Sequence, residues 1–290
     1  MASALAFTTG CDKKKSSGGG GEITEILLPS EIIYSEDDYS DVTKILYDNK
    51  NRITKIMYED EFEDYEYDET GKLTAINNSY GYSITYSYSD NFVTVYYEEN
   101  GDTEVYELQG DKVIKCDVYE ENKLVLSISL EYDSKGNLIK MSGGWDDEED
   151  GYVINSATDI SINYAGEKGA CSGINMPHWI LSGGFTEGLQ QQAVNNPIMV
   201  NCREDYTVEY LGEIVYSDVF TYSESYNYEA FNGDYPSKFT ITYTEDSDDN
   251  PLKKSKMAHF LKGLHKKAKH TRQTSDTYIY HYEIKYIQAK

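Results

Sequence analysis

The sequence has little proline, little cysteine and few positive charges. Its 290 residues include 5 Pro, 4 Cys and 2 Trp, and 26 Lys and Arg stand against 51 Asp and Glu, for a formal net charge of −25. Because binding to nucleic acid needs a basic surface, this balance predicts no nucleic-acid partner. No run of about 18 apolar residues is present, which argues against transmembrane helices. The 29 tyrosines exceed what a disordered chain carries, so a folded protein is indicated.

The scarcity of Cys and His leaves little material for catalysis or metal binding. No Cys-x-x-Cys pair typical of structural zinc occurs. With Cys11 set aside, three cysteines allow at most one disulfide, and Cys171 with Cys202 is the expected pair because Cys116 lies in a strand-like run. Residues 169–173 match a nucleophile-elbow pattern, but that elbow requires a strand-to-helix turn, and the surrounding pattern is that of strands. We therefore predict no catalytic residues, no metal and no cofactor.

The first 21 residues have the composition of a tether. Residues 2–9 are small or apolar, Gly10 precedes Cys11, and residues 12–21 hold three lysines followed by Ser and Gly. This arrangement resembles the end of a bacterial lipoprotein signal, in which the cysteine is acylated and becomes the mature N-terminus. The resemblance implies lipid attachment at Cys11, followed by a flexible Ser/Gly linker. We expect residues 1–21 to be a signal remnant and tether, and residues 22–290 to be a single β-domain.

A repeat extends through residues 44–145. Its pattern is Tyr-Asp-x-x-(Gly/Asn)-x-(Ile/Leu), with clear copies at Tyr47, Tyr67 and Tyr132, weaker ones at Tyr88 and Leu108, and a spacing of 20–24 residues. The Asp can accept hydrogen bonds from amides that follow it, and the Gly or Asn tolerates the positive φ of a tight turn. Each unit therefore predicts two strands joined by a short turn.

The segments between these turns alternate as strands do. Residues 82–88 and 93–97 are rich in Tyr, Thr, Val and Ile, with a period of two. Sequential hairpins of this kind predict an all-β fold. We expect a long curved antiparallel meander of hairpin repeats, with about 20–24 residues per unit.

The Tyr-Asp pattern resembles the repeats of Rhs-type proteins. Combined with the lipoprotein-like start, the Gly linker and the acidic, Tyr-rich strands, residues from about 25 to 290 resemble a family of uncharacterised Bacteroidetes lipoproteins that carry a domain of unknown function. The resemblance implies an all-β fold and a place in the cell envelope, as an outer-membrane lipoprotein on the surface or periplasmic face. It implies no activity and transfers no catalytic residues.

Tyrosine is expected mainly to cover the sheet surface, because its ring buries apolar area while its hydroxyl stays hydrated. A second interpretation is that some exposed rings stack on sugars. The candidates for stacking are Tyr82, Tyr86, Tyr96 and Trp145. For Trp145, which follows two glycines, a place in the core is an equal alternative.

Acidic clusters occur at 59–69, 146–150 and 245–249 and are expected to be solvated turns. None has the ligand spacing of a calcium loop. Residues 151–203, by contrast, hold five charged residues in 53. We expect a long packed connection there, since low charge indicates that a segment is covered or forms an interface.

Residues 251–275 have the opposite character, with eight Lys and Arg and no acid. Met257, Phe260, Leu261 and Leu264 fall on one face of a helix, so we expect a basic helical insertion between two strands. Three roles remain open: binding to an anionic membrane or nucleic acid, docking on acidic turns of the same chain, or no function. Membrane or partner binding would use Lys262, Lys266, Lys267 and Lys269.

The combined expectation is a non-enzymatic, membrane-tethered envelope lipoprotein that binds an extracellular or periplasmic ligand. A polysaccharide is one candidate ligand, suggested by the tyrosine-rich strands, and an envelope protein is the other candidate partner. The first alternative is a structural or assembly component of the cell envelope. The second is a glycoside hydrolase, although nothing in the sequence selects two carboxylates at the required separation.

Overall fold

The computed structural model describes residues 25–149, 152–177, 180, 192–246 and 276–290. The expected tether with Cys11 and the basic insertion 251–275, with its four candidate lysines, lie outside these ranges. The described elements are β1 (Leu27–Glu36), β2 (Tyr39–Tyr47), β3 (Ile53–Met57), β4 (Phe62–Tyr67), β5 (Leu73–Asn78), β6 (Ser83–Ser89), β7 (Phe92–Tyr97), β8 (Thr103–Gln109), β9 (Lys112–Glu120), β10 (Lys123–Tyr132), β11 (Leu138–Glu149), β12 (Tyr152–Lys168), β13 (Asn195–Tyr210), β14 (Glu213–Asn232), β15 (Tyr235–Asp246) and β16 (Asp276–Gln288).

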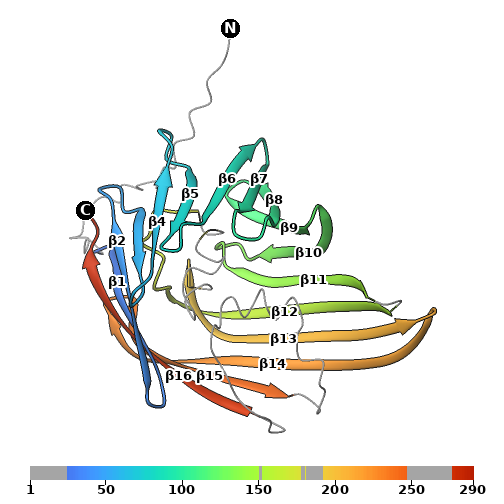
Figure 1. Ribbon diagram of the computed structural model, residues 1–290. Coiled ribbons are helices and arrows are strands. Elements are labelled where there is room, and N and C mark those ends of the chain that lie inside the picture. The colour runs from blue at the N-terminus through green and yellow to red at the C-terminus, as the bar shows by residue number, and fades with distance from the viewer. Residues whose placement is uncertain (1–24, 150–151, 178–179, 181–191, 247–275) are drawn as a thin grey trace.

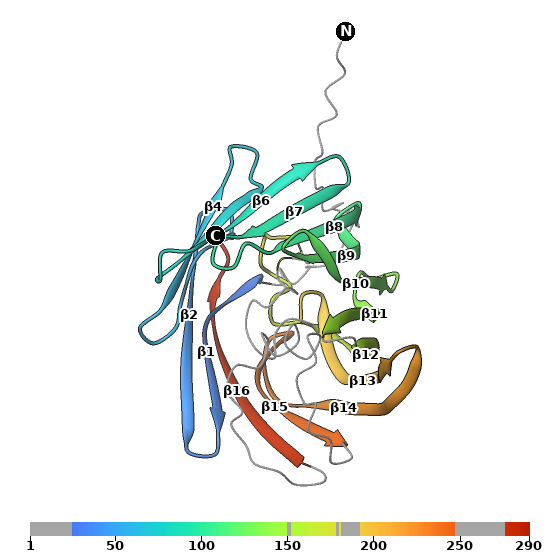
Figure 2. The ribbon, with the colours of Figure 1, turned by 45° about the vertical axis from the view of Figure 1, so that its right-hand side comes forward.

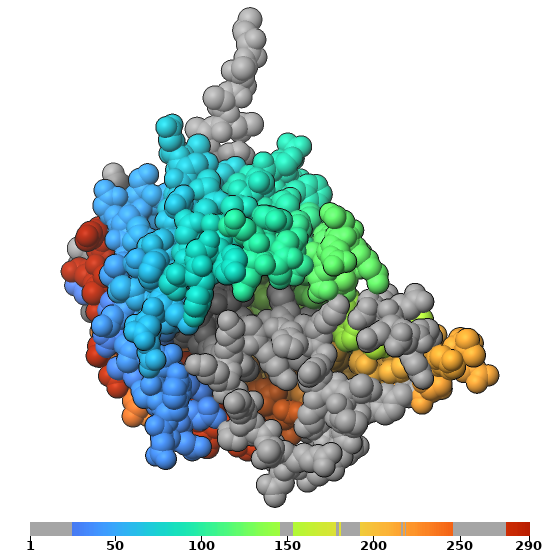
Figure 3. Space-filling view, viewed as in Figure 1, coloured from blue at the N-terminus to red at the C-terminus, as the bar shows by residue number. Residues whose placement is uncertain are grey.

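The sixteen strands form a closed antiparallel barrel (Figures 1 and 2). Each strand pairs with the next along the chain, and β1 pairs with β16 from Leu27 opposite Gln288 to Ser35 opposite His281. In the space-filling view the red β16 lies beside the blue N-terminal strands (Figure 3). The all-β class is confirmed, but the expected long curved meander is not supported, because the strands form a closed barrel. The main chains of the first and last strands bond to each other, so the sheet closes on itself.

Alternate side chains along the strands point into the barrel and form its core. Ile45, Ile56 and Leu73, from the N-terminal strands, share one buried cluster with Ile160 of β12 and Phe239 of β15. Side chains from both halves of the chain can meet in this way inside the closed barrel. The buried face of each strand is therefore the inner face, and the exposed alternate positions face outward.

One rim of the barrel carries a ring of tyrosine hydroxyls bonded to main-chain oxygens. Each donor lies on an even-numbered strand, and each acceptor carbonyl lies near the start of the preceding odd-numbered strand. The pairs are Tyr47 with Pro29, Tyr67 with Ile53, Tyr88 with Leu73, Tyr164 with Leu138, Tyr228 with Pro197 and Tyr286 with Pro236, at 2.6–2.9 Å. The hairpin unit seen in the first half of the sequence thus continues, in structure, through the second half.

The turns that follow Tyr47, Tyr67 and Tyr132 have the geometry expected from the repeat. In each turn the Asp carboxylate accepts main-chain N–H groups from residues two or four positions later, at 2.8–3.0 Å. The position after the turn has positive φ and is Asn51, Gly71 or Gly136. The local prediction is confirmed at all three turns.

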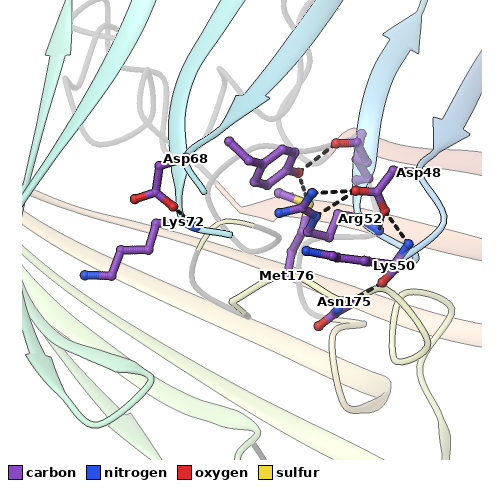
Figure 4. Close-up of polar contacts among 9 residues, drawn as sticks. Asp48, Lys50, Arg52, Asp68, Lys72, Asn175 and Met176 are labelled. Carbon is purple, nitrogen blue, oxygen red and sulfur yellow. Dashed lines mark hydrogen bonds and ion pairs between the residues drawn. The ribbon is translucent and has the colours of Figure 1, made fainter. Parts of the chain in front are cut away.

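The same rim is filled by a segment that we name the plug, residues 169–177 and 192–194, which connects β12 to β13 (Figure 4). Asn175 donates its main-chain N–H to the Asn51 carbonyl at 3.0 Å and its side-chain amide to the Lys50 carbonyl at 2.9 Å. The Tyr67 hydroxyl lies 3.4 Å from the Met176 sulfur. The expected packed connection at 151–203 is therefore two long strands and a plug, and its low charge follows from the inner faces that it contributes.

Candidate functional site

A groove of about 470 Å³ lies on the outer surface of strands β11 to β15. Its lining residues are Lys140, Asp159, Ile160, Ser161, Asn201, Cys202, Arg203, Thr221, Tyr222, Ser223 and Thr244. Among them the polar side chains are exposed or half-buried, whereas Ile160 and Cys202 are buried. The polar residues therefore form the open surface of the groove, and the inward-facing residues lie behind its floor.

The strand register places five of these polar residues in a single row. Lys140 is opposite Ser161, Ser161 opposite Asn201, Asn201 opposite Ser223, and Ser223 opposite Thr244. Neighbouring strands lie about 4.8 Å apart, so the row presents one hydrogen-bonding side chain at each such step across the sheet. The short Ser and Thr side chains in the row leave space above the sheet that larger residues would fill.

A second row beside the first carries opposite charges. Asp159 is opposite Arg203, and Arg203 is opposite Thr221. The Arg203 guanidinium donates two hydrogen bonds to Asp205, at 2.7 and 2.9 Å. These bonds raise the pKa of Arg203 and lower the pKa of the Asp205 carboxyl. The Lys140 ammonium lies 3.9 Å from Asp159, so the groove has both signs of charge at its border.

The structure places the sequence-predicted stacking residues away from this groove. Trp145 is 5 % exposed and packs in the core against Cys116, Leu126 and Ile128. Its interpretation as an exposed platform is therefore wrong, because a ring buried in the barrel interior cannot stack on a ligand outside. Its Nε1–H is buried without a hydrogen-bond partner.

The three tyrosines proposed for stacking do not form one surface. Tyr86 points inward and packs against the core, so it is not a surface platform. Tyr82 and Tyr96 are exposed, but β7, which carries Tyr96, is separated from β11 by three strands. Neither residue lines the groove.

The cysteines of the described residues are free thiols. Cys171 lies in the plug, Cys202 lies on the inner face of β13, and Cys116 is buried in β9. The expected Cys171–Cys202 disulfide is therefore wrong. Burial raises the pKa of both thiols to about 12, so they are held in the unreactive, protonated form at neutral pH.

The described residues contain neither a cluster of metal-binding side chains nor a membrane-spanning helix. Within residues 25–149, 152–177, 180, 192–246 and 276–290, no group of three or more His, Cys, Asp or Glu side chains is arranged to hold a metal ion. No helix in those ranges has the length and apolar character needed to cross a bilayer.

Sequence reasoning did not find the groove. Its residues come from five strands and lie between positions 140 and 244, so no local motif unites them. The available signal was the run of Ser, Thr and Asn at alternate positions in β12 to β15. That signal indicates a polar outer face, but the depression appears only when the strands are placed side by side.

Comparison with known proteins gives distant structural similarities. No family model and no curated protein match the sequence. A porin-like protein from Bacteroides uniformis is 11 % identical with a TM-score of 0.37, over 89 % of this chain and 96 % of that chain. A porin-like protein from Bacteroides vulgatus is 9 % identical with a TM-score of 0.31, over 90 % and 98 %. The TcdB2–TccC3 structure is 15 % identical with a TM-score of 0.27, over 71 % of this chain and 9 % of that chain.

Similarity at these identities and TM-scores carries no conclusion about function. The resemblance to Bacteroidetes lipoproteins and to Rhs repeats stays a prediction. The groove, the plug and the faces of the strands are the observations on which a function can be argued.

Proposed function

We propose that the protein is a non-enzymatic, envelope-tethered binding protein that holds a polar, glycan-like ligand in the groove on its outer wall. The observation that carries the proposal is the row from Lys140 to Thr244. A ligand chain lying across the strands would meet a new hydrogen-bonding side chain about every 4.8 Å, a spacing comparable with the length of one sugar unit. The Ser, Thr and Asn side chains offer both donors and acceptors for hydroxyl groups.

The filled interior favours a ligand site on the outside. A barrel of sixteen strands can be wide enough for an aqueous channel. Here the core cluster joins opposite walls, and the plug residues Ala170, Cys171 and Met176 are part of it. Ligand access is therefore easier at the outer wall than through the barrel.

The outer faces of β12 and β15 have the composition of a surface that faces water. The outward positions of β15 between Lys238 and Thr244 are Lys, Thr, Thr and Thr, and those of β12 between Asn155 and Asn163 are Asn, Ala, Asp, Ser and Asn. Barrels that cross a membrane carry an apolar band at these positions instead. This pattern supports a barrel that stands in water and reaches the membrane by its tether.

A binding role fits the groove better than hydrolysis does. Glycoside hydrolysis generally uses two carboxyl groups about 5–10 Å apart on either side of the bond to be cut. The groove lining contains one carboxylate, Asp159, and it lies beside Lys140. The remaining polar lining residues are suited to recognition by hydrogen bonds.

The test of the ligand class is calorimetric titration with a panel of neutral and acidic oligosaccharides. We expect binding that Asn201→Ala weakens about tenfold, because a polar group of the ligand loses its partner. Thr85→Ala, on the exposed face of β6, is the matched control and should bind as the unaltered protein does. No heat with any oligosaccharide, or equal affinity for Asn201→Ala, would refute the glycan proposal.

The tether is tested separately by acyl labelling of the native precursor in cells. We expect incorporation of labelled fatty acid that Cys11→Ala abolishes. Protease treatment of intact and lysed cells then distinguishes the surface from the periplasmic face. Label retained in Cys11→Ala would contradict lipid attachment at this residue.

A further inference from the structure

Both ends of the described chain lie at the plugged rim. The Ile26 carbonyl accepts the Ala289 N–H at 2.9 Å, and the main-chain N–H of Lys290 donates to the side-chain oxygen of Asn51, in the turn between β2 and β3, at 3.1 Å. A Cβ on Gly173 of the plug would lie 3.0 Å from Ile26 Cγ2, so the start of the described chain packs on the plug. The residues before 25 therefore join the barrel at this rim and not at the opposite one.

The described turns at the opposite rim are strongly acidic. They hold nine Asp and Glu and no Lys or Arg, at 37–38, 58–61, 79–82, 98–102, 121–122 and 211–212. The turns and chain ends described at the plugged rim hold eight Asp and Glu with five Lys and Arg, at 25–26, 48–52, 68–72, 90–91, 110–111, 133–137, 233–234 and 289–290. A surface of anionic lipids therefore repels the opposite rim more strongly than the plugged rim.

Exposed apolar side chains occur along the plugged rim between β13 and β2. These strands, β13 to β16 followed by β1 and β2, are consecutive around the barrel. The residues are 43–51 % exposed and are Ile26, Leu46, Ile198, Phe231 and Ile287. They lie at the rim because they are next to residues of the tyrosine ring, as Ile198 is to Pro197. Exposed apolar residues gathered at one end of a molecule are typical of a contact with a partner or a membrane.

Charge distinguishes this rim from the opposite one, which also exposes apolar side chains. Leu211 is 85 % exposed and Tyr80 65 % exposed at the opposite rim. The Tyr80 hydroxyl, however, donates to the Glu61 carboxylate, in a turn that holds three acids within residues 58–61. Contact of that rim with lipid would bring these uncompensated carboxylates to the headgroups. The plugged rim carries lysines among its apolar residues and has no such excess of acid.

The length of the tether also favours the plugged rim. Residue 25 follows Cys11 by 14 residues (25 − 11). A Gly/Ser-rich chain of that length spans about 20 Å on average. Strand β1, with ten residues, is by itself about 33 Å long, so the opposite rim is farther from the attachment point than this average reach. A lipid on Cys11 therefore holds the plugged rim near the bilayer at the higher effective concentration.

We propose, on the basis of the lipid attachment at Cys11 proposed above, that the barrel rests on the bilayer through its plugged rim. The apolar side chains of the rim lie among the lipid headgroups. The exposed lysines of the same rim lie beside lipid phosphates and are Lys50, Lys72, Lys135 and Lys290. The acidic rim then points away from the bilayer, and the groove on the outer wall stays in water.

Quenching of a fluorophore by labelled lipid tests this orientation. Acylated full-length protein is inserted into vesicles of phosphatidylethanolamine and phosphatidylglycerol that contain a lipid with a nitroxide headgroup. The fluorophore is attached at Asn49→Cys on the plugged rim or, as the matched control, at Ser40→Cys beside the turn 37–38 of the opposite rim. Both positions are exposed and uncharged, and the three cysteines of the described residues are buried. We expect quenching about threefold stronger at Asn49→Cys, because this rim lies at the headgroups.

The outcomes separate the orientation from the tether. Equal quenching at the two positions in vesicle-bound protein would show that the barrel has no preferred orientation, and would overturn the proposed contact while leaving lipid attachment intact. Stronger quenching at Ser40→Cys would place the acidic rim on the lipid and would also overturn it. Protein that does not bind vesicles would refute the lipid attachment, and the orientation with it.

A second variant tests the apolar contact itself. Ile198→Thr combined with Ile287→Thr removes two exposed apolar side chains and leaves residues suited to strands. We expect quenching at Asn49→Cys to fall about twofold, because less apolar area reaches the headgroups. Leu124→Thr, at an exposed apolar position on β10, is the control and should leave the quenching unchanged.

Unchanged quenching in the double variant would show that the apolar residues make no contact with lipid, and would overturn the proposal. A second copy of the chain is the other possible occupant of the rim. If Cys11→Ser protein formed a dimer in gel filtration, and Ile198→Thr with Ile287→Thr separated it, the rim would be an interface between copies and not a membrane contact.

Discussion

At the residue scale, tyrosine hydroxyls make two kinds of hydrogen bond. Those at the plugged rim donate to main-chain carbonyls, and one on the inner wall donates to a carboxylate. At the plugged rim, Tyr67 donates to the Ile53 carbonyl at 2.7 Å, beside a register shift between β2 and β3, where Leu46 is opposite Lys55 but Tyr47 is opposite Ile53. A shift of this kind leaves main-chain groups without ladder partners, and the hydroxyl supplies one. On the inner wall, Tyr226 instead donates to the Glu224 carboxylate at 2.8 Å. The abundance of tyrosine therefore reflects internal hydrogen bonding as much as surface coverage.

The contribution of a rim hydrogen bond to the stability of the protein can be measured by removing one tyrosine hydroxyl. Tyr67→Phe keeps the ring, which lies 4.2 Å from the Arg52 guanidinium, but leaves the Ile53 carbonyl without its donor. We expect a loss of about 1–2 kcal/mol in the free energy of unfolding, measured with urea. Tyr82→Phe, at an exposed ring, is the control and should change stability little. Equal effects of the two substitutions would show that the rim hydroxyl contributes nothing.

Because the Glu104 carboxyl is buried, we expect the free energy of unfolding to depend on pH. Burial raises the pKa of its carboxyl, and hydrogen bonds from Tyr106 and Tyr97 offset part of the rise. The folded protein therefore binds this proton more tightly than the unfolded chain, whose value is near 4.5. The stability that this group confers is present at low pH and is lost as the pH rises through the folded value.

Glu104→Gln removes this titration while keeping an oxygen that can accept from tyrosine. We expect the variant to gain stability relative to the unaltered protein between pH 4 and pH 7, measured by urea unfolding at each pH. Glu107→Gln, on the outer face of the same strand, controls for the loss of one charge. A stability difference that does not change with pH would contradict the assignment.

At the scale of the element, Gly143 and Gly144 allow β11 to approach both neighbouring strands closely. A Cβ on Gly144 would lie 2.1 Å from the Ser156 carbonyl oxygen of β12. A Cβ on Gly143 would lie 2.1 Å from the Ser127 oxygen of β10. Main-chain atoms of paired strands cannot move away without breaking the hydrogen bonds between the strands. Both positions therefore require glycine.

Gly144→Ala should therefore destabilise the barrel by about 3 kcal/mol, through forced separation of β11 and β12. Gly166→Ala is the matched control, because a Cβ there meets no atom within 4 Å and the backbone φ is not in the left-handed region. The melting temperatures of the two variants are compared by thermal unfolding. A melting temperature for Gly144→Ala equal to that of Gly166→Ala would disprove the close approach.

The hairpins were predictable from sequence where the turn chemistry is local. Asp48, Asp68 and Asp133 bond to amides a few residues away, so their pattern is visible in a short window. Tyr164 and Tyr228 occupy equivalent rim positions, but neither is followed directly by Asp, because the chain continues to the plug after Tyr164 and to a tighter turn after Tyr228. The Tyr-Asp pattern therefore does not identify the second half of the repeat.

At the scale of the whole molecule, closure and the groove depend on contacts between distant parts of the sequence. Leu27 pairs with Gln288, and the groove row extends from Lys140 to Thr244. Alternation of apolar and polar residues identifies the two faces of each strand. It does not show which face turns inward or which two strands pair to close the barrel. Trp145 illustrates the limit, since its neighbours in sequence suit either the core or the surface.

The orientation of the faces predicts how the whole protein behaves without lipid. A membrane-spanning barrel exposes an apolar band and needs detergent, whereas this barrel buries Ile45, Ile160 and Phe239 inside and exposes Ser161, Asn201 and similar residues outside. We expect full-length Cys11→Ser protein to enter the aqueous phase in Triton X-114 partition and to melt at the same temperature with and without detergent. The unaltered protein, which we propose is acylated at Cys11, should enter the detergent phase through that lipid alone. If the Cys11→Ser protein aggregated without detergent and were stabilised by it, the outer wall would have to be a lipid-facing surface, and both the outer groove and the tethered binding role would be lost.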